Sequence, residues 1–115
     1  MNKIVIKTTP TFDRKAEKLL MPSLLEELYD YLETYPEKGD LIQGTGGVRK
    51  LRWKAGGSDK GKSGGVRILY HYSKGILVLL ITAYSKSEKE NITKKERNDL
   101  KKLMPQLIAK YKEGL

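Results

Sequence analysis

Apolar and polar residues alternate in several stretches of the chain, a pattern that predicts β-strands. Residues 3–8 alternate around Ile4, Val5 and Ile6, and residues 48–54 place charged and apolar side chains on two different faces. The run Val66–Ser73 is also β-rich. Residues 76–84 are apolar almost throughout, which predicts a central strand that is covered on both sides.

Two helices are predicted before the basic part of the chain. The first covers residues 12–20, with Thr11 as its N-cap. Pro22 either breaks the chain or begins the second helix at its first position, and Ser23 with Glu26 fits a capping box there. The apolar residues of this second helix recur at helical spacing: Leu25, Leu28, Leu32 and Tyr35.

A third helix is predicted at the C-terminal end of the chain. Thr93 and Glu96 form another capping box, and apolar residues recur behind it at helical spacing. Pro105 lies inside this pattern and predicts a kink or a break. Residues 40–47 and 55–65 are expected to be loops. The predicted order is β-α-α-β-β-β-α over a single small domain, residues 1–115: an α+β fold with a mostly antiparallel sheet, packed by the N-terminal helices and a C-terminal helix.

Composition excludes several kinds of chemistry. The 115 residues include no cysteine and one histidine, His71, so disulfides, thiol nucleophiles, cysteine metal sites and paired-histidine sites are excluded. No metal or cofactor is therefore expected, and a lone histidine in a strand is more often structural than catalytic. The first residues lack the apolar stretch of a signal peptide, and no apolar run is long enough to span a membrane. We expect a cytoplasmic protein without membrane association.

Positive charge is concentrated in one segment. The formal net charge is +9, and residues 49–67 carry seven Lys and Arg side chains but a single acidic one. Such a run is often just a solvated face. Seven cations against one acid in nineteen residues nevertheless favour a surface that binds phosphates.

One apparent nucleotide-binding motif lies in this segment and is rejected. Residues 56–63, Gly-Gly-Ser-Asp-Lys-Gly-Lys-Ser, match the P-loop pattern G-x-x-x-x-G-K-[ST]. A P-loop needs a helix after the loop, so that helix-terminal N–H groups point at the phosphates. Here a predicted strand follows, so the sequence predicts a basic connection between two strands that binds no ATP or GTP.

The predicted sheet places cations and an aromatic residue together. Lys50 and Arg52 project to one side of a strand, Arg67 begins the next, and Tyr84 and Lys86 end the third. Cations directed at one phosphate, beside an aromatic ring that stacks a base, suit RNA binding and cleavage. Further RNA contacts are expected from Arg49, Lys54, Lys60 and Lys62.

Each of these residues also has a simpler interpretation. Arg67 and Lys86 are ordinary surface cations if taken singly, and Tyr84 is a core residue at the end of an apolar strand. As a surface cation, Arg67 is expected to contribute less than about 0.5 kcal/mol to stability. The glycines before it, Gly64 and Gly65, are expected to let a phosphate approach the backbone. Trp53 is expected to pack in the core.

A long ordered set of residues links these elements. It comprises Pro36-x-x-Gly-Asp-Leu-Ile-Gln-Gly-Thr-Gly-Gly-Val-Arg-Lys-Leu-Arg52, a basic glycine loop, Gly64-Gly-Val-Arg-Ile-Leu-Tyr70 and Tyr84-Ser-Lys-Ser-Glu88. In this set, and over nearly its whole length, the chain resembles the HigB branch of the RelE toxin superfamily. The resemblance implies a microbial-RNase-like fold and a toxin of a type II toxin–antitoxin pair. It also implies metal-independent cleavage of mRNA in the ribosomal A site, and an antitoxin partner with a helix-turn-helix domain, encoded in the same operon.

The resemblance also implies roles for individual residues. Arg67 would hold and neutralise the scissile phosphate, and Lys50 or Arg52 would anchor the backbone or assist proton removal. Tyr84 would orient a base, and Lys86 would stabilise the leaving oxygen. Other members carry an arginine near the last strand where this chain has Ser87, so the division of labour stays open. Two alternatives remain: a non-catalytic RNA- or DNA-binding module, and a ribonuclease that acts without the ribosome.

Overall fold

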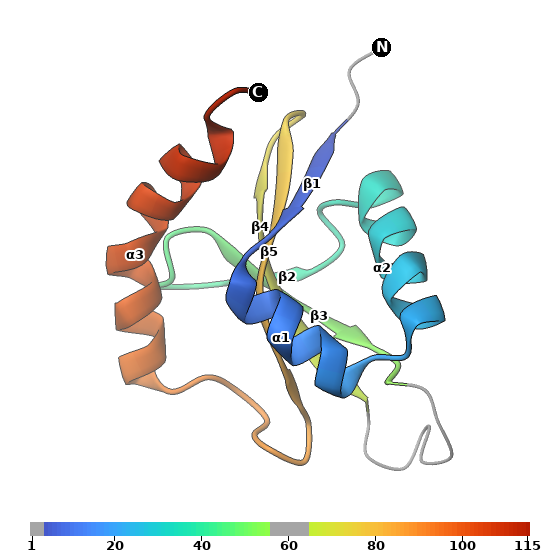
Figure 1. Cartoon of the computed structure of the whole chain (residues 1–115). Helices are drawn as coiled ribbons and strands as arrows, with labels where there is room; N and C mark the ends of the chain where they lie inside the picture. The colour runs from blue at the N-terminus through green and yellow to red at the C-terminus, as the bar shows by residue number, and fades with distance from the viewer. Residues whose placement is uncertain (1–3, 56–64) are drawn as a thin grey trace.

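The protein folds as a five-stranded sheet with helices on both faces (Figure 1). The structure is a computed structural model and describes residues 4–55 and 65–115. Its elements, in chain order, are β1 (Val5–Thr8), α1 (Pro10–Leu19), α2 (Pro22–Thr34), β2 (Asp40–Ile42), β3 (Val48–Trp53), β4 (Val66–Ser73), β5 (Leu77–Ser85) and α3 (Lys94–Lys112). The strand order is β1-β5-β4-β3-β2, and every pair is antiparallel except β1 with β5. The α+β class predicted from the sequence is confirmed.

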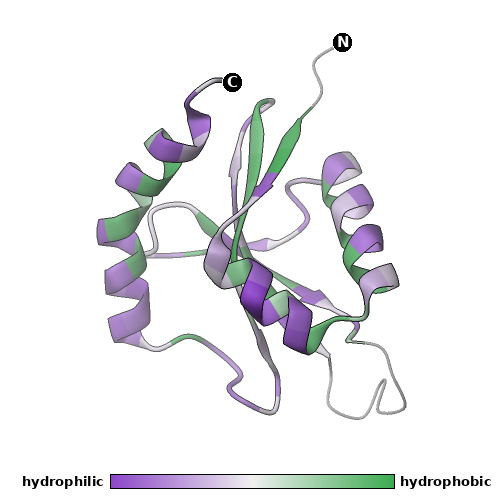
Figure 2. Cartoon of the chain, viewed as in Figure 1, coloured by the Kyte–Doolittle hydropathy of each residue, from purple (hydrophilic) through white to green (hydrophobic). Residues whose placement is uncertain are grey.

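Each face of the sheet packs against its own helices. On one face, Phe12 of α1 and Leu28 and Leu32 of α2 pack with Ile68 and Tyr70 of β4. On the other face, Met104 of α3 packs with Leu69 of β4 and with Leu77 and Leu79 of β5. Because side chains alternate along a strand, β4 and β5 supply both clusters, which explains their nearly continuous apolar sequence. Figure 2 shows α3 with green, hydrophobic positions between purple, hydrophilic ones along its length.

The helix starts differ from the predictions at two places. α1 begins at Pro10, and its N-cap is Thr9 rather than Thr11: the Thr9 Oγ1 accepts a hydrogen bond from the Phe12 N–H at 3.0 Å. Pro10 takes the first helical position, where its missing N–H costs nothing. α2 begins at Pro22, which confirms the second of the two interpretations of that proline. Its N-cap is Met21 and makes no side-chain capping bond, so the capping box predicted from Ser23 and Glu26 is wrong.

Two further predictions needed correction. Residues 40–42 form the edge strand β2, paired with β3, where a loop was expected. A three-residue strand is too short to give an alternating pattern, and it exists only through its pairing. α3 continues through Pro105 to Lys112 without the break that proline predicted, whereas its Thr93–Glu96 capping box is confirmed. No helix within the described ranges is long and apolar enough to cross a membrane.

His71 has a structural role at the end of β4 far from Arg67. Its Nδ1 lies 2.8 Å from the Gly47 carbonyl oxygen and its Nε2 lies 2.8 Å from the Ser73 Oγ. Because a carbonyl only accepts, Nδ1 carries the proton of the neutral ring, and Nε2 accepts from Ser73. Burial lowers the pKa of His71, assisted by the charges of Lys112 and Arg49.

Acidification is therefore expected to destabilise the protein through His71. The unfolded chain takes up a proton near pH 6.5 while the folded imidazole resists it, so stability present above that pH is lost as the pH falls. The loss is at most about 1.4 kcal/mol per pH unit for one group. Urea unfolding at pH 7.5, 6.5 and 5.5 measures it, and His71→Asn should flatten the dependence. An equal pH dependence in both proteins would contradict the assignment.

Candidate phosphate-binding site

Three candidate residues lie side by side on the three inner strands of the sheet, near one end of each strand. In the strand register, Arg52 of β3 is opposite Arg67 of β4, and Arg67 is opposite Tyr84 of β5. Directly opposed residues of antiparallel strands project to the same face. Tyr84 belongs to the core cluster under α3, so this row lies on the α3 face of the sheet. The predicted pairing of the three strands, and the convergence of these residues, are both present.

Arg67 is a buried residue, which corrects the expectation that it is an ordinary surface cation. Only 2% of it is exposed, and its Nη2 lies 3.1 Å from the Glu90 Oε2. Two arginines directly opposite each other repel, and the Glu90 carboxylate counters that repulsion. The hydrogen bond from Arg67 lowers the pKa of Glu90, and the charges of Arg67, Lys86 and Arg52 lower it further. Glu90 is therefore ionised at neutral pH.

Tyr84 is covered in this structure. The residue is 2% exposed, and the Lys89 Nζ lies 5.1 Å from the centre of its ring. Burial raises the pKa of Tyr84, so the phenol is neutral. Its side of the sheet borders a cavity of about 310 Å³, which Ile92 and Leu100 also line. A base reaches the tyrosine ring only after the residues above it move.

Replacement of Tyr84 by phenylalanine is expected to leave stability unchanged within about 0.5 kcal/mol, or to raise it slightly. Among the described residues the buried Tyr84 hydroxyl has no hydrogen-bond partner, so the substitution removes an unsatisfied polar group and keeps the ring. Chemical denaturation measures the change. A loss above about 1 kcal/mol would mean that the hydroxyl is bonded in solution. The same variant reports whether RNA cleavage needs the hydroxyl or only the ring.

Two lysines flank the row. Lys50, on the same side of β3 as Arg52, is half-buried, and its Nζ donates a hydrogen bond of 2.7 Å to the Asn91 Oδ1. Lys86 follows β5 and is exposed, and its backbone N–H donates to the Gly65 carbonyl at 3.2 Å. Lys54 follows β3 and is exposed. The structure thus brings Lys50, Arg52, Arg67, Tyr84 and Lys86 together.

Of the other expected RNA contacts, Arg49 does not join this group. Arg49 lies on the opposite face of β3, and its Nη1 donates to the carbonyls of Glu37 at 3.1 Å and Gly39 at 2.8 Å. Lys60 and Lys62 lie outside the described residues. Trp53 packs as expected, with its Nε1 donating to the Leu24 carbonyl at 2.9 Å.

The rejected P-loop also falls on residues 56–63, outside the described residues. β3 precedes these residues and β4 follows them, and the two strands are antiparallel neighbours. The chain enters β4 directly after Gly65, so the helix that a P-loop requires does not follow. Gly65 itself has φ +76°, and a Cβ there would overlap the Trp53 carbonyl. Gly65 is thus needed for close contact with β3, while Gly64 lies outside the described residues.

Sequence reasoning missed the residues that contact the cations. Glu90 and Asn91 belong to the β5–α3 connection, residues 86–93, which has no periodic pattern. In the sequence, the one available sign of this contact was an acidic residue, Glu90, close to the basic Lys86 and Lys89. Within residues 4–55 and 65–115, no group of three or more His, Cys, Asp or Glu side chains is arranged to hold a metal ion.

A comparison with models of protein families shows the family of the chain. The family model of the RelE toxin of the RelE/RelB toxin–antitoxin system matches residues 6–115. The chain belongs to the RelE toxin family. The match takes in all the described helices and strands except Val5, the first residue of β1. As a RelE toxin, the protein has an antitoxin as its partner in a toxin–antitoxin system.

Proposed function

We propose that this RelE-family toxin is an endoribonuclease that cleaves mRNA on the ribosome and thereby inhibits translation. The observation that carries the proposal is the row of Arg52, Arg67 and Tyr84 on one face, flanked by Lys50 and Lys86. Binding alone would need the cations, but not an aromatic residue in the same row. The proposed site of action is the cytoplasm, where the ribosomes are.

The proposed reaction is attack by a 2′-oxygen on the adjacent phosphorus. The 2′-hydroxyl loses its proton, the new P–O2′ bond forms, and the P–O5′ bond breaks. The leaving 5′-oxygen takes up a proton, so the products are a 2′,3′-cyclic phosphate and a 5′-hydroxyl. These steps require charge stabilisation at phosphorus and proton transfer at both ends, which side chains can supply without a metal ion.

The residues divide these tasks by chemistry. Arg67 can form two hydrogen bonds to phosphate oxygens and keeps its charge at any physiological pH. Lys50 or Arg52 anchors the RNA backbone or assists proton removal, and Lys86 stabilises the leaving oxygen. Tyr84 orients a base once its ring is uncovered. The proposed partner is an antitoxin with a helix-turn-helix domain, encoded in the same operon.

The decisive experiment compares one mRNA in two states. Purified protein is incubated with the mRNA on translating ribosomes and with the same mRNA alone, and the cut ends are mapped. Cleavage on ribosomes only, with cyclic phosphate ends, is expected. Cleavage of naked RNA would favour a ribosome-independent ribonuclease, and binding without cleavage would favour a non-catalytic module. Because no step needs a metal, brief EDTA treatment that leaves ribosomes intact should not stop the reaction.

A pair of lysine variants controls for net charge. Lys86→Ala is expected to slow cleavage by about 100-fold or more, since it removes the cation at the leaving oxygen. Lys74 is exposed and lies in the turn after β4, at the end away from Arg67. Lys74→Ala removes the same charge and should cleave like the wild type. Equal effects of the two variants would contradict the proposed site.

A further inference from the structure

A carboxylate lies among the cations of the proposed phosphate site. The Glu90 Oε2 is 3.1 Å from the Arg67 Nη2, and Lys86 and Arg52 also act on this carboxylate. Arg67 is buried, whereas half of the Glu90 side chain is exposed. An anion held by one buried guanidinium and two neighbouring cations occupies the environment that a phosphodiester would need.

The rest of the β5–α3 connection covers neighbouring members of the site. The Asn91 Oδ1 accepts the hydrogen bond from Lys50, and the Lys89 ammonium lies over the Tyr84 ring. Ile92 packs in the same apolar cluster as Tyr84. Three of the five candidate residues are thus in contact with a connection of eight residues.

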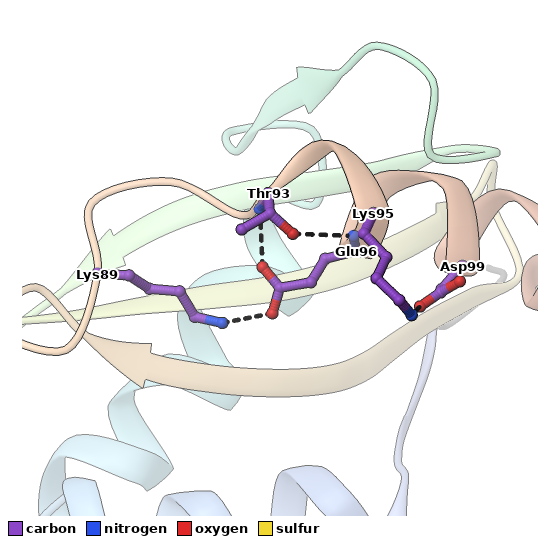
Figure 3. A network of polar contacts seen from close by, with 5 residues as sticks. All are labelled: Lys89, Thr93, Lys95, Glu96 and Asp99. Atoms are coloured by element: carbon purple, nitrogen blue, oxygen red, sulfur yellow. Dashed lines mark hydrogen bonds and ion pairs between the residues drawn. The ribbon is translucent and has the colours of Figure 1, made fainter.

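One end of this connection is fixed to α3 (Figure 3). The Lys89 Nζ lies 2.5 Å from the Glu96 Oε2, while the Glu96 Oε1 accepts from the Thr93 N–H at 2.7 Å. The Thr93 Oγ1 in turn accepts from the Glu96 N–H at 3.1 Å, which completes the capping box. This network holds residues 89 and 93, but it does not include the side chains of Glu90 and Asn91.

We propose that Glu90 occupies the position at which the scissile phosphate binds, and that it competes with RNA for Arg67. RNA must then displace residues 90 and 91 to bind. The inference rests on the proposed function, because it assumes that RNA uses Arg67. A carboxylate and a phosphate cannot share one guanidinium at close range, since two anions a few ångströms apart repel. RNA outcompetes the Glu90 carboxylate because its neighbouring phosphates also bind the lysines around the site. The free toxin is therefore partly self-inhibited.

The test is the affinity for a single-stranded oligonucleotide with a 2′-deoxy residue at the cleavage position, measured by fluorescence anisotropy. Glu90→Gln removes the competing charge and is expected to tighten binding about tenfold. Glu88→Gln is the matched control, because Glu88 is an exposed acid of the same connection and its loss changes the net charge equally. It should tighten binding by about twofold or less, the effect of one screened surface charge.

Two results would overturn the inference. Equal tightening by Glu90→Gln and Glu88→Gln would mean that only net charge matters. Weaker binding by Glu90→Gln would mean that Glu90 positions Arg67 for RNA instead of blocking it. Urea unfolding of both variants establishes that the comparison is between folded proteins.

Arg67→Ala in the same assay separates this inference from the proposed function. If Arg67→Ala binds as tightly as the wild type, the phosphate site itself is misplaced and both proposals fail. If Arg67→Ala weakens binding while Glu90→Gln does not tighten it, only the competition is wrong.

Discussion

Replacement of Arg67 by alanine is expected to reduce RNA cleavage by about 100- to 1,000-fold and to abolish toxicity in growing cells. Arg67 is buried between the exposed Arg52 and the buried Tyr84, so its guanidinium is already oriented before the charge on the phosphate develops. Loss of one preorganised donor at a developing charge has that magnitude. Cleavage rates on programmed ribosomes, and growth of cells that express the variant, measure the effect.

The same substitution is also expected to lower the free energy of unfolding, by about 1–3 kcal/mol. Burial and the ion pair with Glu90 make Arg67 part of the structure, and hydrogen bonds to charged groups contribute in this range. Activity must therefore be compared at a temperature where both proteins are folded, as judged by circular dichroism. Arg67→Lys keeps the charge without the planar fork and should restore activity only in part. The site would be misplaced if Arg67→Ala stayed fully toxic while Tyr84→Ala or Lys86→Ala lost toxicity.

Replacement of Gly65 by alanine is expected to destabilise the protein by about 2–5 kcal/mol. Two costs add: a positive φ of +76°, which a residue with a side chain adopts at about 1–3 kcal/mol, and overlap of the new Cβ with the Trp53 carbonyl. Because that carbonyl belongs to backbone, it moves only if β3 moves. The variant should also cleave poorly, since Arg67 lies two residues further along the chain.

Gly75 provides the matched control for this prediction. It has φ +77°, and no atom lies within 4 Å of the position that its Cβ would take. Gly75→Ala therefore carries the cost of the backbone conformation alone, about 1–3 kcal/mol. Urea unfolding of the two variants isolates the overlap at Gly65. Equal losses would show that β3 moves away from an alanine at little cost.

The fold was largely predictable because its main elements have strong local patterns. β4 and β5 are long and apolar, and α3 carries a complete capping box, so these elements could be predicted without knowledge of the tertiary structure. The errors lie where local signals compete or are too short. Thr9 and Thr11 are both acceptable N-caps, and the position of Pro10 decided between them. β2 has three residues and forms only because it can pair with the edge of β3.

For the site, the sequence by itself determined which residue types are present and on which face of each strand they project. Alternation put Lys50 and Arg52 together, and the order of the strands put Arg67 and Tyr84 beside them. Only the tertiary structure decided that Arg67 and Tyr84 are buried and that Glu90 and Asn91 contact the cations. The reason is physical: a face follows from the two-residue period of a strand, whereas burial and counter-charge depend on an irregular connection from elsewhere in the chain, which no period describes.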